Sequence, residues 1–131
     1  MDAAGKVTAG SINKLAMLSL EKVHPEENSG ILLVNSRRQI SGLTPSLLTI
    51  WNLPEVIVRS RSDRLALEFV SEQFDNPQGF LKDMSEIYEQ TQLEIHEKVT
   101  LKSGRQIERH SKPLWVNDVY AGRLWVFALN P

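Results

Sequence analysis

Histidine and cysteine, the side chains that most often bind metals or act as nucleophiles, are few in this sequence. There is no cysteine, which excludes disulfides, cysteine zinc sites, thiolate nucleophiles and cysteine-linked cofactors. The three histidines, His24, His96 and His110, show no metal-ligand spacing on a shared helix or turn. We therefore expect local or surface roles for the histidines and no metal site.

Glu97 is the polar residue whose position is most informative. It lies between Ile95 and Val99, in the apolar phase of an alternating segment. Either Glu97 lies at a sheet edge or in a β-bulge that exposes its side chain to solvent, or its carboxylate lies inside a cavity. A buried carboxylate needs a partner, and Arg109 and Arg123 are the candidates for that pairing.

Recognisable catalytic motifs are absent from the sequence. The chain has no glycine-rich phosphate loop, no GxSxG nucleophile motif, no paired-histidine metal motif and no kinase signature. We therefore expect a domain that is not an enzyme. One enzymatic alternative stays open: a small cone-shaped α+β isomerase or hydrolase in which Glu97 and His110 form the acid–base pair.

Length and charge narrow the class of protein further. The 131 residues suffice for one domain, and 15 Lys and Arg against 16 Asp and Glu argue against a nucleic-acid-binding surface. No segment approaches the roughly 20 apolar residues that a membrane helix needs. The first residues have no apolar core of the signal-peptide type. We expect a cytoplasmic chain with no membrane segment and no nucleic-acid partner.

The beginning of the chain predicts a helix that stands apart from the rest. An apolar stripe with helical spacing runs between residues 11 and 23, and Pro25 ends it. The stripe consists of Ile12, Leu15, Ala16, Ser19 and Val23. The chain therefore divides into a flanking amphipathic helix with its linker, residues 1–29, and a domain, residues 30–131.

Five segments predict strands. They are residues 31–34, a short stretch around Ile40, and residues 93–102, 105–116 and 119–129. Residues 93–102 alternate and predict one wet face, whereas the last strand is apolar on both faces around residues 124–127. A strand that is apolar on both faces is covered on both sides. We expect helices on one face of the sheet and the flanking helix on the other.

The middle of the chain predicts helices. Thr44 and Pro45 form a helix start with cap and first-turn proline in the right order. Asp63 is interpreted as the cap of a second helix, and a third covers about residues 77–88. The basic run of residues 59–64 is interpreted as an exposed loop and not as a phosphate site.

Four segments in this order resemble the PAS domains of bacterial sensor histidine kinases. Residues 30–35 (GILLVN) are similar to the first PAS strand, and residues 43–54 (LTPSLLTIWNLP) to the entry into the first core helix. Residues 101–114 (LKSGRQIERHSKPL) are similar to the family's hairpin, and residues 122–127 (GRLWVF) to its closing strand. The resemblance implies an α+β fold with an antiparallel sheet of about five strands and helices on one face.

Three positions depart from the family's pattern. Arg38 stands where the family often has glycine, so the first turn can be of another type, and Thr44 replaces the common asparagine cap. The Asp-x-Thr motif that couples the family's last strand to an output helix is absent after Phe127. Either the chain ends before its output segment, or it does not couple in the usual way.

The resemblance also implies a pocket between the helices and the sheet. The lack of cysteine excludes the cysteinyl-flavin and thioester-chromophore branches of the family, and residues 77–88 contain no histidine to hold haem. We therefore expect no such cofactor. The residues that line this pocket, or fill it as ordinary core, are Trp51, Phe69, Phe80, Tyr88, Glu97, Arg109, Trp125 and Phe127.

The function that the resemblance implies is sensing or protein interaction inside a bacterial signalling protein. A change in the pocket or sheet would be passed to a linked or interacting output domain, and no ligand is identifiable from the residues. We expect a homodimer in which the flanking helix covers the outer sheet face or its equivalent in a second subunit. A ligand-free dimerisation module with a packed core is the alternative.

Overall fold

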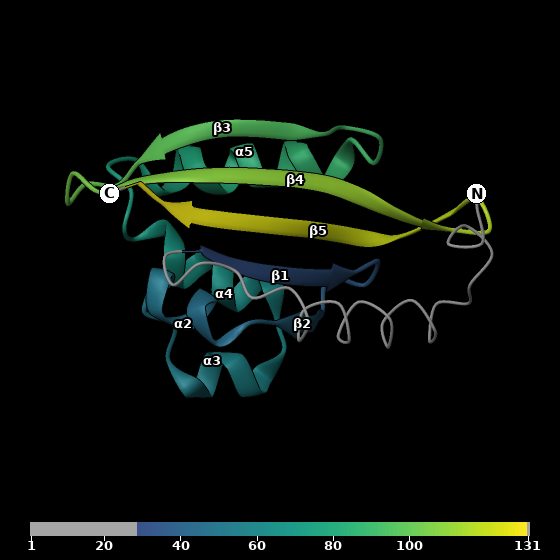
Figure 1. The fold of residues 1–131 in the computed structure, drawn as a ribbon, viewed down its shortest axis with the longest axis horizontal. Coiled ribbons are helices and arrows are strands. Elements are labelled where there is room, and N and C mark those ends of the chain that lie inside the picture. The colour runs from purple at the N-terminus through teal and green to yellow at the C-terminus, as the bar shows by residue number, and fades with distance from the viewer. Residues whose placement is uncertain (1–28, 131) are drawn as a thin grey trace.

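The computed structural model describes residues 29–130, which form an antiparallel five-stranded sheet with helices on one face (Figure 1). The strands are β1 (Ser29–Asn35), β2 (Ile40–Leu43), β3 (Ile95–Thr100), β4 (Gln106–Val116) and β5 (Val119–Leu129). Their order in the sheet is β2-β1-β5-β4-β3, so the first and last strands are neighbours in the middle. The expected fold class is confirmed. The flanking helix expected at residues 11–23 lies outside the described residues.

The helices of the described residues are α2 (Pro45–Trp51), α3 (Glu55–Ser60), α4 (Asp63–Ser71) and α5 (Pro77–Glu89). None is long and apolar enough to cross a membrane. Helix α3 replaces part of the expected loop at residues 59–64, and it buries no residue. A helix without a buried face leaves no apolar stripe in the sequence, which is why the pattern did not predict α3.

One expected helix cap, Asp63, is wrong, whereas Thr44 stands at the N-cap of α2 with Pro45 in the first turn, as expected. Ser62, not Asp63, caps α4, because its hydroxyl accepts a hydrogen bond from the Leu65 amide at 3.2 Å. Thr44 occupies the N-cap position of α2, but its side chain makes no cap bond to the helix. Its Oγ1 instead accepts a hydrogen bond from the Ile31 amide at 2.9 Å, which ties the start of α2 to β1.

The turn between β1 and β2 keeps a left-handed residue although glycine is absent. Arg38 has φ of 63°, a region that glycine enters without steric cost. Asn35 supports the turn, since its Oδ1 accepts hydrogen bonds from the amides of Arg37 and Gln39. The backbone of Arg38 also accepts a hydrogen bond from the Asp63 amide at 3.2 Å. The hairpin is thereby fixed to the start of α4.

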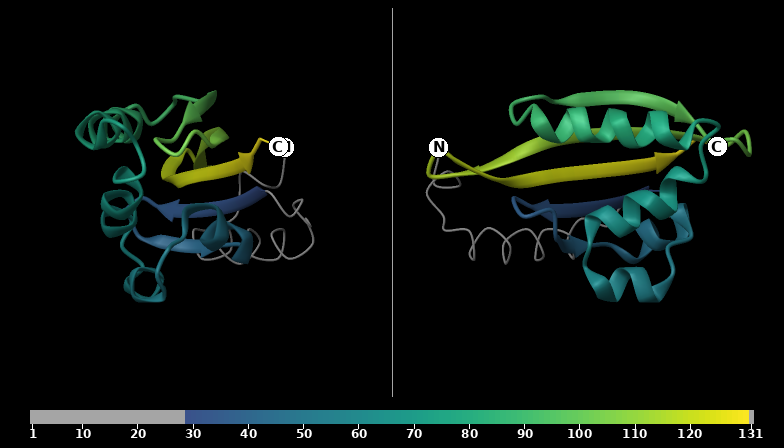
Figure 2. Two further views of the ribbon diagram at one scale, coloured as in Figure 1. Left: turned by 90° about the vertical axis from the view of Figure 1, so that its left-hand side faces the viewer. Right: turned by 180° about the vertical axis from the view of Figure 1, so that it is seen from behind.

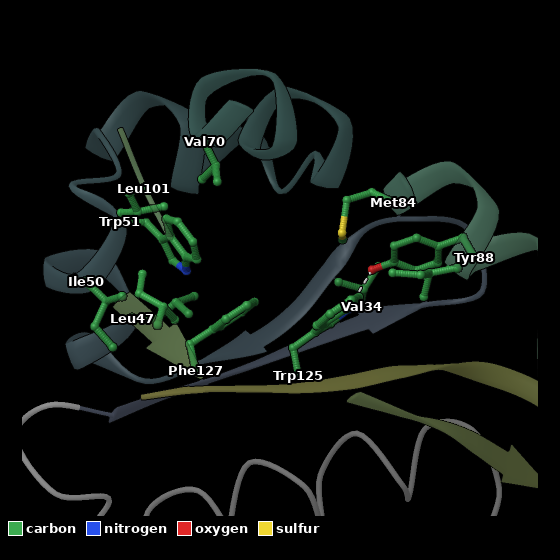
Figure 3. Close-up of a cluster of buried hydrophobic side chains, with 12 residues drawn as sticks. Val34, Leu47, Ile50, Trp51, Val70, Met84, Tyr88, Leu101, Trp125 and Phe127 are labelled. Atoms are coloured by element: carbon green, nitrogen blue, oxygen red, sulfur yellow. Dashed lines mark hydrogen bonds between the residues drawn. The ribbon is translucent and has the colours of Figure 1, made fainter. Parts of the chain in front are cut away.

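The hydrophobic core lies between the helices and the inner face of the sheet (Figure 3). Trp51 of α2 meets Phe127 of β5 edge-to-face with ring centroids 5.3 Å apart. Phe127 in turn stacks along β5 with Trp125. Helix α2 packs directly on β1 at Gly30, where a Cβ would lie 2.7 Å from the backbone of Leu47. This close approach brings α2 onto the central strands.

The outer face of the sheet, opposite the helices, is divided into an apolar half and a polar half. All the described helices lie on the other face, as the end-on view in Figure 2 shows. On β1 and β5 the outward side chains are Ile31, Leu33, Leu124, Val126 and Ala128, whereas β4 and β3 present Glu108, His110, Lys112, His96 and Lys98. Ile31 and Leu33 are buried. We call the β1 and β5 set the outer apolar face.

Candidate functional site

A small cavity lies inside the core between the helical layer and the sheet. Its volume is about 40 Å³, and apolar side chains from α2, α4, α5 and β5 form most of its lining. The charged residues among its lining are Asp63 and Arg109. Such a volume holds one or two water molecules, whereas pockets for metabolites measure roughly 300–1,000 Å³. In this packed arrangement the cavity has no room for an ordinary small-molecule ligand.

The structure distributes the eight expected pocket residues over four places. Trp51, Phe80, Arg109 and Phe127 line the cavity. Tyr88 and Trp125 belong to the packed core beside it. Glu97 lies at the protein surface next to Arg109, and Phe69 lines a separate groove with Glu72, Leu101 and Lys102.

Arg109 is a buried cation that joins three elements. It lies on β4 with a side chain only 5% exposed. Its Nε donates to Glu97 Oε1 of β3 at 2.9 Å, and its Nη2 donates to Asp83 Oδ2 of α5 at 2.6 Å. Among the described residues, the one acceptor of its Nη1 is the thioether sulfur Met84 Sδ, at 3.4 Å. Glu97 and Asp83 are 43% and 50% exposed, so the charge of a buried guanidinium is balanced from the surface.

The pairing of Glu97 with Arg109 follows from strand register. The two residues face each other directly across β3 and β4, on the side of the sheet that carries the helices. Of the two expectations for Glu97, a side chain turned to water or a paired carboxylate, the structure shows the pairing with Arg109, with Glu97 partly exposed. Arg123, the other candidate partner, serves a different connection.

Arg123 fastens the C-terminal end of α5 to the sheet. It is fully buried on β5, and its Nη1 donates to Ser111 Oγ on β4 at 2.9 Å. Its Nη2 donates to the carbonyls of Leu93 at 2.6 Å and Gln90 at 3.2 Å. These carbonyls belong to the connection between α5 and β3. One buried arginine therefore positions the segment that leads from the helical layer into the sheet.

A second buried network connects the β1–β2 hairpin with α4, α5 and β5. Asp63 is 1% exposed and accepts from Arg38 Nε at 3.0 Å. The Arg38 guanidinium lies 3.7 Å above the ring of Tyr88, a cation–π contact. The Tyr88 hydroxyl accepts a hydrogen bond from Trp125 Nε1 at 3.0 Å (Figure 3).

Burial dominates the electrostatics of this network. Burial raises the pKa of Asp63 above its ordinary value, although the charge of Arg38 and hydrogen bonds from Arg38 and Tyr88 oppose the change. Burial and the nearby Asp63 carboxylate both raise the pKa of Tyr88, whose hydroxyl therefore stays protonated. The Tyr88 hydroxyl thus remains available as a donor at any physiological pH.

His96 and His110, the histidines of the described residues, lie apart from the cavity. His96 and His110 stack on the polar half of the outer sheet face with ring centroids 5.1 Å apart. Glu97 faces the helices, so the acid–base pair that the enzymatic alternative requires, Glu97 with His110, is split between opposite faces of the sheet. His24 lies outside the described residues. Within residues 29–130, no three His, Cys, Asp or Glu side chains gather to hold a metal.

Sequence reasoning missed Asp83 and the network of Arg38, Asp63 and Tyr88. Asp83 lies on the exposed side of a helix pattern, and only the packing of α5 beside β4 brings it to Arg109. Asp63 was interpreted as a helix cap, and this local role gave no reason to look for a distant partner such as Arg38. The detectable signal was the phase of Arg109 and Arg123, because each occupies an inward position on its strand, next to the apolar Ile107 and Trp125, respectively.

Comparison with solved structures finds the same fold in a histidine kinase sensor region and in a PAS domain. The sensor region of a sensor histidine kinase superposes with a TM-score of 0.60 at 12% identity, over 92% of this chain and 48% of that one. The PAS domain of a protein from Colwellia psychrerythraea superposes with a TM-score of 0.53 at 13% identity, over 91% of this chain and 97% of that one. This chain thus spans about half of the first structure. No protein-family model and no curated protein sequence matches the chain.

Proposed function

We propose that this chain, which has the PAS fold, is a sensory or protein-interaction module of a bacterial signalling protein, such as a sensor histidine kinase. It works in the cytoplasm and passes a change in its own structure to a linked or interacting output domain. The likeness to the sensor region of a histidine kinase supports the signalling role. The observation that carries the proposal is the set of buried charged groups that join the helical layer to β4 and β5.

These buried groups give the module a means of transmission. Arg109 and Arg123 lie on neighbouring central strands and bind α5 and the α5–β3 connection, respectively. A displacement of α5 removes partners from buried cations, which is costly unless the strands adjust. The outer side chains of β5 alternate with Arg123, Trp125 and Phe127 along the same strand. A displacement of the helices therefore shifts β5 and, with it, the side chains that β5 presents on the outer sheet face.

The outer apolar face is the surface through which we propose that the module forms a homodimer. Its partly exposed members Leu124 and Val126 lie on β5 beside the buried Leu33 of β1, so that the apolar face is continuous across the two strands. We propose that the apolar stripe predicted from the sequence covers this face from the same or a second copy; it consists of Ile12, Leu15, Ala16, Ser19 and Val23. Buried apolar area of this kind drives association.

Sedimentation velocity over a range of protein concentrations tests the dimer. Val126→Glu places a charge on the outer apolar face and is expected to yield a monomer that keeps the circular dichroism of the unmodified chain. Lys112→Glu, on the polar half of the same face, is the matched control and leaves the dimer intact. A chain that sediments as a monomer at high concentration contradicts the dimer.

A ligand-free dimerisation module is the second candidate, and the size of the cavity favours it. A cavity of about 40 Å³ is too small for a metabolite unless the helices move outward. Without a ligand, the signal would come from contacts with a partner protein. Native mass spectrometry of freshly purified protein distinguishes the two candidates. Excess mass that denaturation releases supports a ligand, whereas a mass equal to that of the chain or its dimer supports the ligand-free module.

A further inference from the structure

A groove on the surface lies directly outside the internal cavity. It has a volume of about 370 Å³ and is lined by residues from the first half of α5, from β3 and from the loop before α5. Figure 2 shows α5 running alongside β3 at this edge of the molecule. Phe74, Phe80, Val99 and Arg109 line both the groove and the cavity. Because the same four side chains face both spaces, a single layer of side chains separates the cavity from the solvent in the groove. We call this layer the partition.

The polar tie across this partition is the cluster of Arg109, Asp83 and Glu97. Asp83 brings α5 to Arg109 and Glu97 brings β3 to it, so one guanidinium holds both walls of the groove. The far end of α5 is held separately, through Arg123 and through the Tyr88–Trp125 hydrogen bond. Within the described residues, the first half of α5 therefore depends on Arg109 for its polar attachment to the sheet.

We propose that the groove between α5 and β3 is the entrance to the internal cavity and that Arg109 is its latch. When Asp83 leaves Arg109, the first half of α5 moves away from β3 while its C-terminal end stays anchored. Groove and cavity then form one space. Asp83 and Glu97 are about half exposed, so each carboxylate returns to water without being stranded in the core.

The latch rests on the proposed function in one respect only, namely that a ligand uses the entrance. The opening itself is a property of the chain and is measured without any ligand. A failure of the sensing proposal therefore leaves the opening measurable, and a failure of the latch leaves the PAS-type signalling role untouched.

Hydrogen–deuterium exchange of α5 tests the latch. Asp83→Asn removes the charge-assisted bond to Arg109, and we expect amides of residues 81–85 to exchange about tenfold faster. Glu97→Gln should have a similar effect on β3. Asp75→Asn is the matched control, because Asp75 lines the same groove without a hydrogen bond to Arg109. Amides of β1 and β5 should keep their exchange rates in all variants.

Oxidation of Met84 supplies a second readout that reports access to the cavity itself. Met84 lines the cavity and is buried, and hydrogen peroxide converts its sulfur to the sulfoxide while the peroxide is reduced to water. Peptide mass spectrometry should show faster oxidation of Met84 in Asp83→Asn than in Asp75→Asn. Equal rates in the two variants overturn the proposal. Faster exchange that extends to β1 and β5 also overturns it, because it indicates loss of global stability and not a local latch.

Discussion

The buried Asp63 carboxylate makes the stability of this domain depend on pH in a direction that the structure fixes. Burial raises the pKa of Asp63 in the folded chain above its ordinary value of 3.8. As pH rises, the unfolded chain therefore releases this proton first. Between the two pKa values the folded chain binds more protons, so the free energy of unfolding falls as pH rises. The contribution is complete below the unfolded pKa and is lost as pH rises through the folded pKa.

Asp63→Asn removes this titration while keeping the size of the side chain and an oxygen that accepts from Arg38 and Tyr88. The informative quantity is the free energy of unfolding of the unmodified chain minus that of the variant. Between the unfolded and folded pKa values it should fall by up to about 1.4 kcal/mol per pH unit and then level off. Because Arg38 partly offsets the burial, the pH window in which the difference falls should widen in an Arg38→Met background.

Urea unfolding followed by tryptophan fluorescence, at closely spaced pH values from acidic to neutral, measures this difference. Ser62→Ala is the matched control, since it removes the adjacent cap of α4 at a cost of about 1 kcal/mol and contains no titrating group. Its effect should be the same at every pH. A difference between Asp63→Asn and the unmodified chain that stays flat, or grows with pH, refutes the reasoning.

Three further changes probe the packing that positions the site. Gly30→Ala places a Cβ 2.7 Å from the backbone of Leu47 and should lower the free energy of unfolding by about 1–3 kcal/mol, measured by urea unfolding. Tyr88→Phe removes the acceptor for Trp125 Nε1 and should cost about 1–3 kcal/mol, with a changed near-ultraviolet circular dichroism of the tryptophans. An unchanged near-ultraviolet spectrum speaks against that hydrogen bond. Asp118→Gly relieves a left-handed residue in the β4–β5 turn, at φ 65°, and should raise stability by about 0.5–1 kcal/mol. A loss of thermal stability in this variant contradicts the turn geometry.

The sheet was predictable from the sequence because its signals are local and repeat along the chain. The alternation after residue 93 and the doubly apolar last strand predicted the three C-terminal strands, and β5 has the predicted bounds of residues 119–129. Helix α3 was not predictable in the same way. It has six residues and no buried face, so neither its length nor its pattern separates it from a loop.

The candidate site was only partly predictable, because its chemistry depends on contacts between distant residues. The phase of Glu97 and Arg109 along their strands indicated a possible pair, and the register of β3 and β4 makes it. The joining of Asp83 to Arg109 and of Arg38 to Asp63 depends on how α5 and α4 pack on the sheet. These two pairs are separated by 26 and 25 positions in the sequence, respectively. Hydrophobic periodicity carries no signal of contacts over such separations.

The central claim is that the helical layer and the outer sheet face are coupled, and one binding measurement tests it most directly. Coupling between two sites requires that a change at one alter the equilibrium at the other. The dimer dissociation constant, from sedimentation equilibrium, is compared for the unmodified chain, Asp83→Asn and Asp75→Asn. We predict that Asp83→Asn shifts it several-fold while Asp75→Asn does not. Identical dissociation constants for all three chains contradict the coupling.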